Sequence, residues 1–186
     1  MMGNKNLIPY DYRALITWGV IASFLFTFSQ TLLSYSLVFG IVFITLFIFL
    51  GLFIDYKLTK KQNLLMQIKN FTSMQIFIFK IAISIFIFMS IFSILSLKID
   101  EYSFVYTLWI FIISIFSLIL SYLIKTKIYE LHANVLFLTS IFLLFLSMFL
   151  NSEQLRFFSQ ILCIIEIGFG YILIGILKNI ESKTQN

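Results

Sequence analysis

The chain has few of the residues on which most enzymes and metal proteins depend. Its 186 residues include one histidine, one cysteine and one proline, and only 11% of them are charged. A single cysteine, Cys163, excludes an intrachain disulfide and a cysteine-based metal framework. A single histidine, His132, cannot supply both axial ligands of a haem. No glycine-rich phosphate loop or acidic cluster with metal-ligand spacing is present either, so we expect no cofactor and no metal, and we favour a protein that is not an enzyme.

Hydrophobic residues make up 61% of the chain, compared with about 45–50% in soluble domains. Runs of 18 or more apolar residues are long enough to cross a bilayer as helices. The sequence predicts an all-α fold, a six-helix transmembrane bundle, between a polar or interfacial segment at residues 1–13 and a polar tail at residues 179–186. The predicted spans cover residues 14–33, 35–54, 76–97, 103–124, 133–150 and 157–177.

The basic residues predict how these spans are oriented. Lys and Arg are enriched in the loops on the inner side of a membrane. With an inner N-terminus, only Lys98 and Arg156 lie outside, which predicts three in-out-in hairpins with both chain ends inside. The eleven inner residues are Lys5, Arg13, Lys57, Lys60, Lys61, Lys69, Lys80, Lys125, Lys127, Lys178 and Lys183.

This distribution also bears on partners and location. It explains the net charge of +5 without nucleic acid, because the basic residues lie in short loops and no basic folded domain is present. We expect the lipid bilayer and other membrane protein subunits as partners. Both the bacterial cytoplasmic membrane and the inner membrane of an organelle fit this composition.

The longest predicted connection, residues 55–75, has two interpretations. Leu64, Leu65, Ile68 and Phe71 recur at helical spacing, as in a short amphipathic helix on the inner membrane surface. A solvated basic loop fits the same residues, because the apolar stripe is only two turns long.

The last span carries one carboxylate near its midpoint, Glu166. A charged side chain at this depth costs about 2.5–3.5 kcal/mol on insertion scales, so such residues usually face other helices or a wet cavity. Ser159, Cys163, Glu166 and Gly170 are spaced four, three and four apart, which predicts one shared helix face. Glu166 is then either a protonatable or cation-binding group in a substrate path, or a hydrogen-bonded carboxyl that fixes helix packing.

A proton or cation path would need a second polar group. Thr27 and Gln30 on the first span are the candidates, and we interpret the serine stripes of the other spans mainly as packing contacts. His132, at the inner end of the fifth span, is predicted to lie more than about 10 Å from Cys163 along the membrane normal, too far for a nucleophile and its base. We interpret the 24 phenylalanines as lipid-compatible surface and give the aromatic residues no ligand role.

Three functions fit these observations. The first is a small transporter or solute-binding membrane component that acts with partner proteins; in span count and length the chain resembles the substrate-binding subunits of energy-coupling-factor importers. The second is a structural or assembly subunit of a larger membrane complex, such as a respiratory one. The third is an intramembrane enzyme that uses Glu166. Membrane peptidases of the accessory-gene-regulator type also have six spans, but their closely spaced His and Cys motif is missing here.

Overall fold

The computed structural model of the protein describes residues 8–98 and 102–184, and over these residues the chain is helical and contains no strand. Six helical segments are long and apolar enough to cross a membrane. The predicted fold class, an all-α bundle of six spans, is therefore confirmed.

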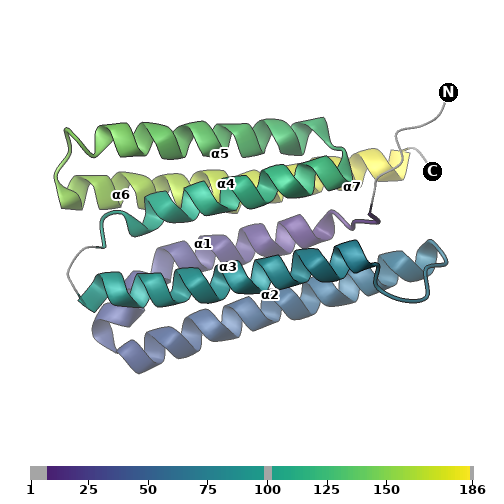
Figure 1. Ribbon diagram of the computed structural model, residues 1–186, viewed down its shortest axis with the longest axis horizontal. Helices are drawn as coiled ribbons and strands as arrows, with labels where there is room; N and C mark the ends of the chain where they lie inside the picture. The colour runs from purple at the N-terminus through teal and green to yellow at the C-terminus, as the bar shows by residue number, and fades with distance from the viewer. Residues whose placement is uncertain (1–7, 99–101, 185–186) are drawn as a thin grey trace.

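The first five spans are single helices, and the sixth contains three consecutive helical segments. Between α6 and α7 the backbone widens into a π-helical segment, η1, with no break in the helix. All six spans run along the long axis of the molecule (Figure 1). The elements are α1 (Arg13–Tyr35), α2 (Leu37–Leu65), α3 (Ser73–Lys98), α4 (Val105–Ile124), α5 (Lys127–Leu146), α6 (Ser152–Leu162), η1 (Cys163–Phe169) and α7 (Gly170–Thr184).

Helix α1 lies at the centre of the bundle. It packs against α2 on one side and against η1 and α7 on the other, while α4 packs mainly against α5. Glycine allows the close approach of α1 to the last span: a Cβ built on Gly19 would lie 2.5 Å from the carbonyl oxygen of Gly168. Such contacts between small residues drive helix association in membranes, where helices gain little from burying apolar surface.

Short polar turns join several of the spans. Ser36 alone separates α1 from α2, and its side chain accepts a hydrogen bond from the backbone N–H of Phe39. Lys125 adopts a left-handed conformation, with φ of 54°, between α4 and α5. Asn151 and Gln154 form a reciprocal capping box at the start of α6. The Ser36 and Asn151 side chains satisfy free N–H groups at the starts of α2 and α6, and Lys125 ends α4 as its C-cap.

The structure corrects the connection at residues 55–75. Helix α2 continues to Leu65, the chain turns at Gln67 with a positive φ of 59°, and α3 begins at Ser73. No separate surface helix forms, and the solvated loop is much shorter than the polar sequence suggests. The physical reason is that no glycine or proline interrupts residues 52–65, so the helix extends through its lysines and Gln62.

Other helix ends also differ from the predicted ones. Helix α5 spans Lys127–Leu146 rather than residues 133–150, and α6 begins at Ser152 rather than after Arg156. The tail predicted at residues 179–186 is helical as far as Thr184. Of the residues used to predict orientation, Lys5 and the side chains of Lys98 and Lys183 lie outside the described part of the structure.

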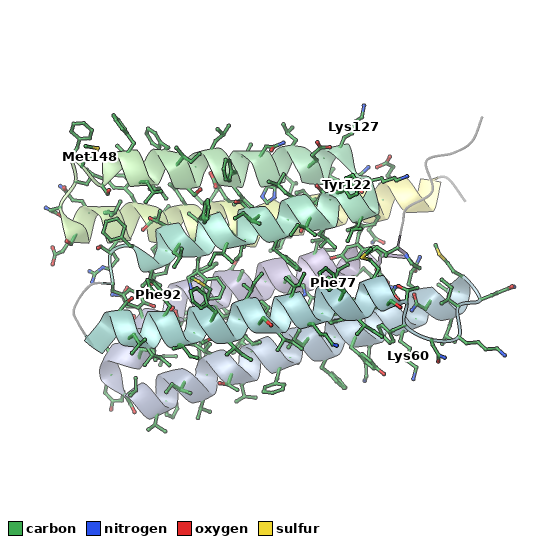
Figure 2. All side chains as sticks on the ribbon, viewed as in Figure 1. Lys60, Phe77, Phe92, Tyr122, Lys127 and Met148 are labelled. Atoms are coloured by element: carbon green, nitrogen blue, oxygen red, sulfur yellow. The ribbon has the colours of Figure 1, made fainter. Side chains whose placement is uncertain are left out.

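Large apolar side chains cover the outward faces of the helices along most of their length (Figure 2). The lysines gather at one end, which we call the lysine end: it is the end at which α1, α3 and α5 begin and α2 and α4 finish. Lys60 and Lys127 lie there, whereas Met148 lies at the opposite end.

Candidate functional site

The main hollow of the bundle is a cavity of about 120 Å³. Engineered protein cavities of about 150 Å³ take up benzene, so this space accepts a narrow apolar group. The cavity lies between α1, α3 and α4, with α2, η1 and α7 contributing smaller parts of its wall. The residues of the three main helices that line it recur every three or four positions, as on one helix face: Leu15, Trp18, Ala22, Leu25 and Ser29 of α1; Ala82, Phe86, Ser90 and Ser93 of α3; and Tyr106, Trp109, Ile113, Phe116 and Leu120 of α4.

Aromatic side chains dominate the cavity wall, since ten of its 23 lining residues are Phe, Tyr or Trp and none is charged. Adjacent rings lie 5.1–6.2 Å apart, within the usual range for aromatic pairs. They form a continuous row that starts near the lysine end and finishes just before α4 begins at the opposite end. The row runs through Trp18, Phe86, Trp109, Phe26, Tyr106 and Tyr102.

The cavity exists because α3 stands away from the rest of the bundle. Among the described residues, the backbone of α3 packs mainly against α4 and over few positions, whereas α1 packs extensively against both α2 and the last span. Large rings fill part of the remaining space, with Phe86 of α3 stacked on Trp18 of α1 at 5.1 Å. Helix α3 is therefore the wall that can move with least loss of backbone packing.

The two tyrosines nearest the cavity ends remain uncharged. Burial raises the pKa of Tyr102 to about 12, and burial together with nearby Asp55 raises the pKa of Tyr10 well above its usual value. Desolvation disfavours the charged phenolate, so both side chains present a neutral hydroxyl at physiological pH. The ends of the cavity are polar without being charged.

Three hydroxyl groups form a small network in the wall toward the lysine end. The Ser117 hydroxyl of α4 is bonded to the Tyr171 hydroxyl of α7, and Tyr129 of α5 donates to Ser117 Oγ at 3.4 Å. This network joins three helices at one level. It satisfies polar groups that would otherwise be costly to bury.

The carboxyl of Glu166 lies beside α5, and Glu166 is absent from the cavity wall. Its Oε1 accepts a hydrogen bond from Thr139 Oγ1 of α5 at 2.8 Å. Its other oxygen, Oε2, is buried and has no hydrogen-bond partner among the described residues. The neighbouring Ile167 lines the cavity instead, so Glu166 occupies a separate polar site between η1 and α5.

The backbone of Glu166 is bound by His132, which the sequence analysis placed at the inner end of the fifth span. The π-helical turn diverts the N–H of Gly170 to the carbonyls of Ile165 and Ile167. His132 Nε2 lies 2.7 Å from the carbonyl oxygen of Glu166. Because a carbonyl only accepts, Nε2 carries the hydrogen. Gly170 provides the space, since a Cβ there would overlap the imidazole ring.

Ser159 and Cys163 lie apart from the Glu166 carboxyl. Both are fully buried; Ser159 Oγ donates to the carbonyl of Leu155 in its own helix at 2.7 Å, and the Cys163 thiol lies 3.4 Å from the Tyr106 carbonyl of α4. The residues predicted to share one helix face therefore do not all meet the same neighbouring helix. Cys163 is on the α4 side of the last span, and Glu166 and Gly170 are on the α5 side.

Thr27 and Gln30 have partners other than Glu166. Thr27 is exposed on α1 and donates to the carbonyl of Ser23 at 2.7 Å. Gln30 Oε1 accepts a hydrogen bond of 3.3 Å from the Tyr106 hydroxyl, and Tyr106 lines the cavity. Gln30 therefore reaches the cavity wall indirectly, near its end opposite the lysines. No group of three or more His, Cys, Asp or Glu side chains in the described ranges could hold a metal ion.

The sequence analysis missed the aromatic cavity and the carboxylate of Asp55. Five of the ten aromatic lining residues are tyrosines and two are tryptophans. Tyr and Trp usually mark the membrane interface. Trp109 and Tyr171 lie instead within helices that are long and apolar enough to span it, and these positions were the available signal.

Comparisons with models of protein families, with curated proteins and with solved structures find no match to this chain.

Proposed function

We propose that this protein is a solute-binding membrane component that holds one slender apolar molecule, or the hydrocarbon chain of an amphipathic one, in the cavity between α1, α3 and α4. The observation that carries the proposal is the uncharged cavity of about 120 Å³ with its row of aromatic rings. Ligand sites are typically concave and mostly apolar, with a small number of polar groups that orient the ligand.

The shape of the cavity supports a chain-like ligand. Its walls extend from Tyr10, before α1, to Tyr102, before α4, so the hollow is long compared with its volume. A compact ligand would use only part of that length, whereas a single hydrocarbon chain can follow the whole row of rings. Helix α3 provides a route of entry from the bilayer, because it packs least tightly against the other helices.

Two substitutions on α3 test this proposal. Ala82 lines the cavity, and the adjacent Ile83 is 41% exposed on the outer surface. We expect Ala82→Phe to fill the cavity and to reduce binding of a saturated fatty alcohol by at least about tenfold, while Ile83→Phe binds like the wild type. The measurement is retention of the alcohol by the detergent-purified protein in native mass spectrometry. Equal retention by both variants would contradict a ligand in this cavity.

Glu166 supports a second proposal, a proton or cation path along α5. Its buried Oε2 has no hydrogen-bond partner in the described structure, and its turn is π-helical, a feature often found at functional sites. On this proposal Glu166→Gln abolishes proton movement into liposomes that contain the protein and a trapped pH dye. Its fatty-alcohol binding should be unchanged. Unaltered proton movement would leave Glu166 as a packing residue.

A further inference from the structure

A carboxylate lies beside the end of the cavity nearest the lysines. Asp55 belongs to the continuous helix α2, and both its oxygens accept hydrogen bonds from neutral donors. Trp18 Nε1 donates to Oδ2 at 2.9 Å, and Thr59 Oγ1 donates to Oδ1 at 3.2 Å. Within the part of the chain that the structure describes, Asp55 makes no ion pair. These contacts orient the carboxyl group, but they bring no positive charge to it.

The carboxylate and the apolar cavity share side chains. Asp55 lines a smaller hollow of about 30 Å³ with Thr59 and Gln75. Tyr10 and Leu120 line both this hollow and the main cavity. Trp18 lines the main cavity and donates to Asp55. A molecule in the cavity that extends past Tyr10 would therefore meet Asp55.

The local charge favours a positive group at this position. Asp11, whose charge acts on Asp55, is already paired with Arg13 through hydrogen bonds of 2.9 and 3.2 Å from Nε. The ammonium of Lys57 lies over the Phe53 ring, 4.3 Å from its centroid. Among the described residues, Asp55 therefore has no positive partner of its own beside a hollow that shares the side chains of Tyr10 and Leu120 with the apolar cavity.

The other polar groups of the smaller hollow are already occupied. Gln75 and Asn63 exchange two amide hydrogen bonds of 2.9 Å, and Gln75 also donates to the Pro9 carbonyl. Tyr10 is neutral, as described above. Asp55 is therefore the group in this hollow with an unmet electrostatic requirement.

We infer that the ligand is an amphiphile with an amine head group and a single hydrocarbon chain, the ammonium bound at Asp55 and the chain lying in the aromatic cavity. This inference rests on the proposed function, because it assigns a head-group site to the same cavity. An ammonium has three donors and also carries the positive charge that balances a carboxylate, whereas an alcohol has one uncharged donor and an ionised carboxylate head group has none. The amine can come from a membrane lipid or from a free amphiphile, since both present the same chemistry.

Three amphiphiles of one chain length test the inference: a primary amine, the corresponding alcohol and the corresponding fatty acid. We expect the wild-type protein to bind the amine about tenfold more tightly than the alcohol, and the acid most weakly. Asp55→Asn should remove the advantage of the amine and leave alcohol binding unchanged, which also shows that the variant is folded. The control is Glu130→Gln, an exposed acid at the same end of the bundle, and it should bind like the wild type.

The outcomes separate this inference from the proposed function. Equal binding of amine and alcohol, unaffected by Asp55→Asn, would overturn the head-group site and leave the cavity proposal standing. Failure of all three amphiphiles to bind would overturn both. If the amine is preferred, competition by vesicles that contain a single-chain ethanolamine lysophospholipid identifies a lipid source, and competition by the free amine alone identifies a soluble amphiphile.

Discussion

At the scale of single residues, the bundle depends on positions where any side chain larger than hydrogen would be excluded. Gly170 is one of these, because its missing Cβ leaves room for the imidazole of His132. The ring uses that room to reach the Glu166 carbonyl at 2.7 Å. A small residue on one helix thus allows a polar contact from another, and both form only in the folded bundle.

Gly170→Ala should destabilise the protein by about 1–3 kcal/mol, the usual cost of overpacking a filled site. His132→Ala removes the ring that the new methyl would meet. The double variant should therefore lose less stability than the sum of the two single variants. Denaturant unfolding of the detergent-solubilised protein measures all three. Additive losses would show that the two side chains do not compete for this space.

The residue scale is also where the sequence was least informative. The regular spacing of Ser159, Cys163, Glu166 and Gly170 predicts one shared helix face, but it assumes an uninterrupted α-helical repeat. The π-helical segment Cys163–Phe169 lies inside that interval and changes which neighbour each residue meets. No residue pattern in an apolar stretch indicates a π-helical segment. For the same reason, Asp55 looked like the first residue of a loop although it lies within α2.

At the scale of helices, the connection between α2 and α3 is held by two amides. Asn63 and Gln75 are almost fully buried and exchange hydrogen bonds of 2.9 Å in both directions. Gln75 Oε1 also accepts from the backbone N–H of Thr72, which fixes the start of α3. This pair links the end of α2 to the beginning of α3, the helix that packs least tightly against the others.

Asn63→Ala should cost about 1–3 kcal/mol, because it leaves both polar ends of the buried Gln75 amide short of a partner. Opening of this connection should also expose residues 66–72 to proteolysis. The nearby exposed Lys61→Ala is the control. Digestion of the three proteins in detergent, followed by mass spectrometry of the fragments, measures the effect. Equal cleavage of the wild type and Asn63→Ala would mean that the amide pair does not hold the turn.

Sequence periodicity predicted the existence of the helices well and their ends less well. Hydrophobic runs of bilayer length are unambiguous, so all six spans were found. The boundaries depend on caps and helix-forming polar residues, which extend α2 to Leu65 and start α5 at Lys127. The cavity could not be predicted, because it arises from the distance between α3 and α1, which no local pattern encodes.

At the scale of the whole molecule, orientation in the membrane follows from charge. We propose that the lysine end faces the inner side. In a Cys163→Ser background, a cysteine replacing the exposed Lys61 should react with a membrane-impermeant thiol reagent only from the inside. A cysteine replacing the exposed Glu153, at the other end of the last span, should react only from the outside. The reverse pattern in sealed cells or vesicles would invert the bundle.

Recovery from the native membrane decides between a binding component and a purely structural subunit. Mild-detergent purification followed by mass spectrometry identifies both co-purifying proteins and bound small molecules. We expect a bound amphiphile whether or not partner proteins co-purify with the chain. Stable partners without any bound amphiphile would instead favour a structural or assembly subunit.

The most direct test of the cavity uses its own tryptophans. The sequence contains two tryptophans, Trp18 and Trp109, and both line the cavity. A brominated fatty alcohol quenches indole fluorescence on contact, so titration of Trp18→Phe and Trp109→Phe reports on each ring separately. We predict saturable quenching with one shared midpoint in both proteins, and its loss when Ala82→Phe is added. Quenching that rises without saturation, or that persists with Ala82→Phe, would mean that the chain contacts the outer surface and that the cavity binds no ligand.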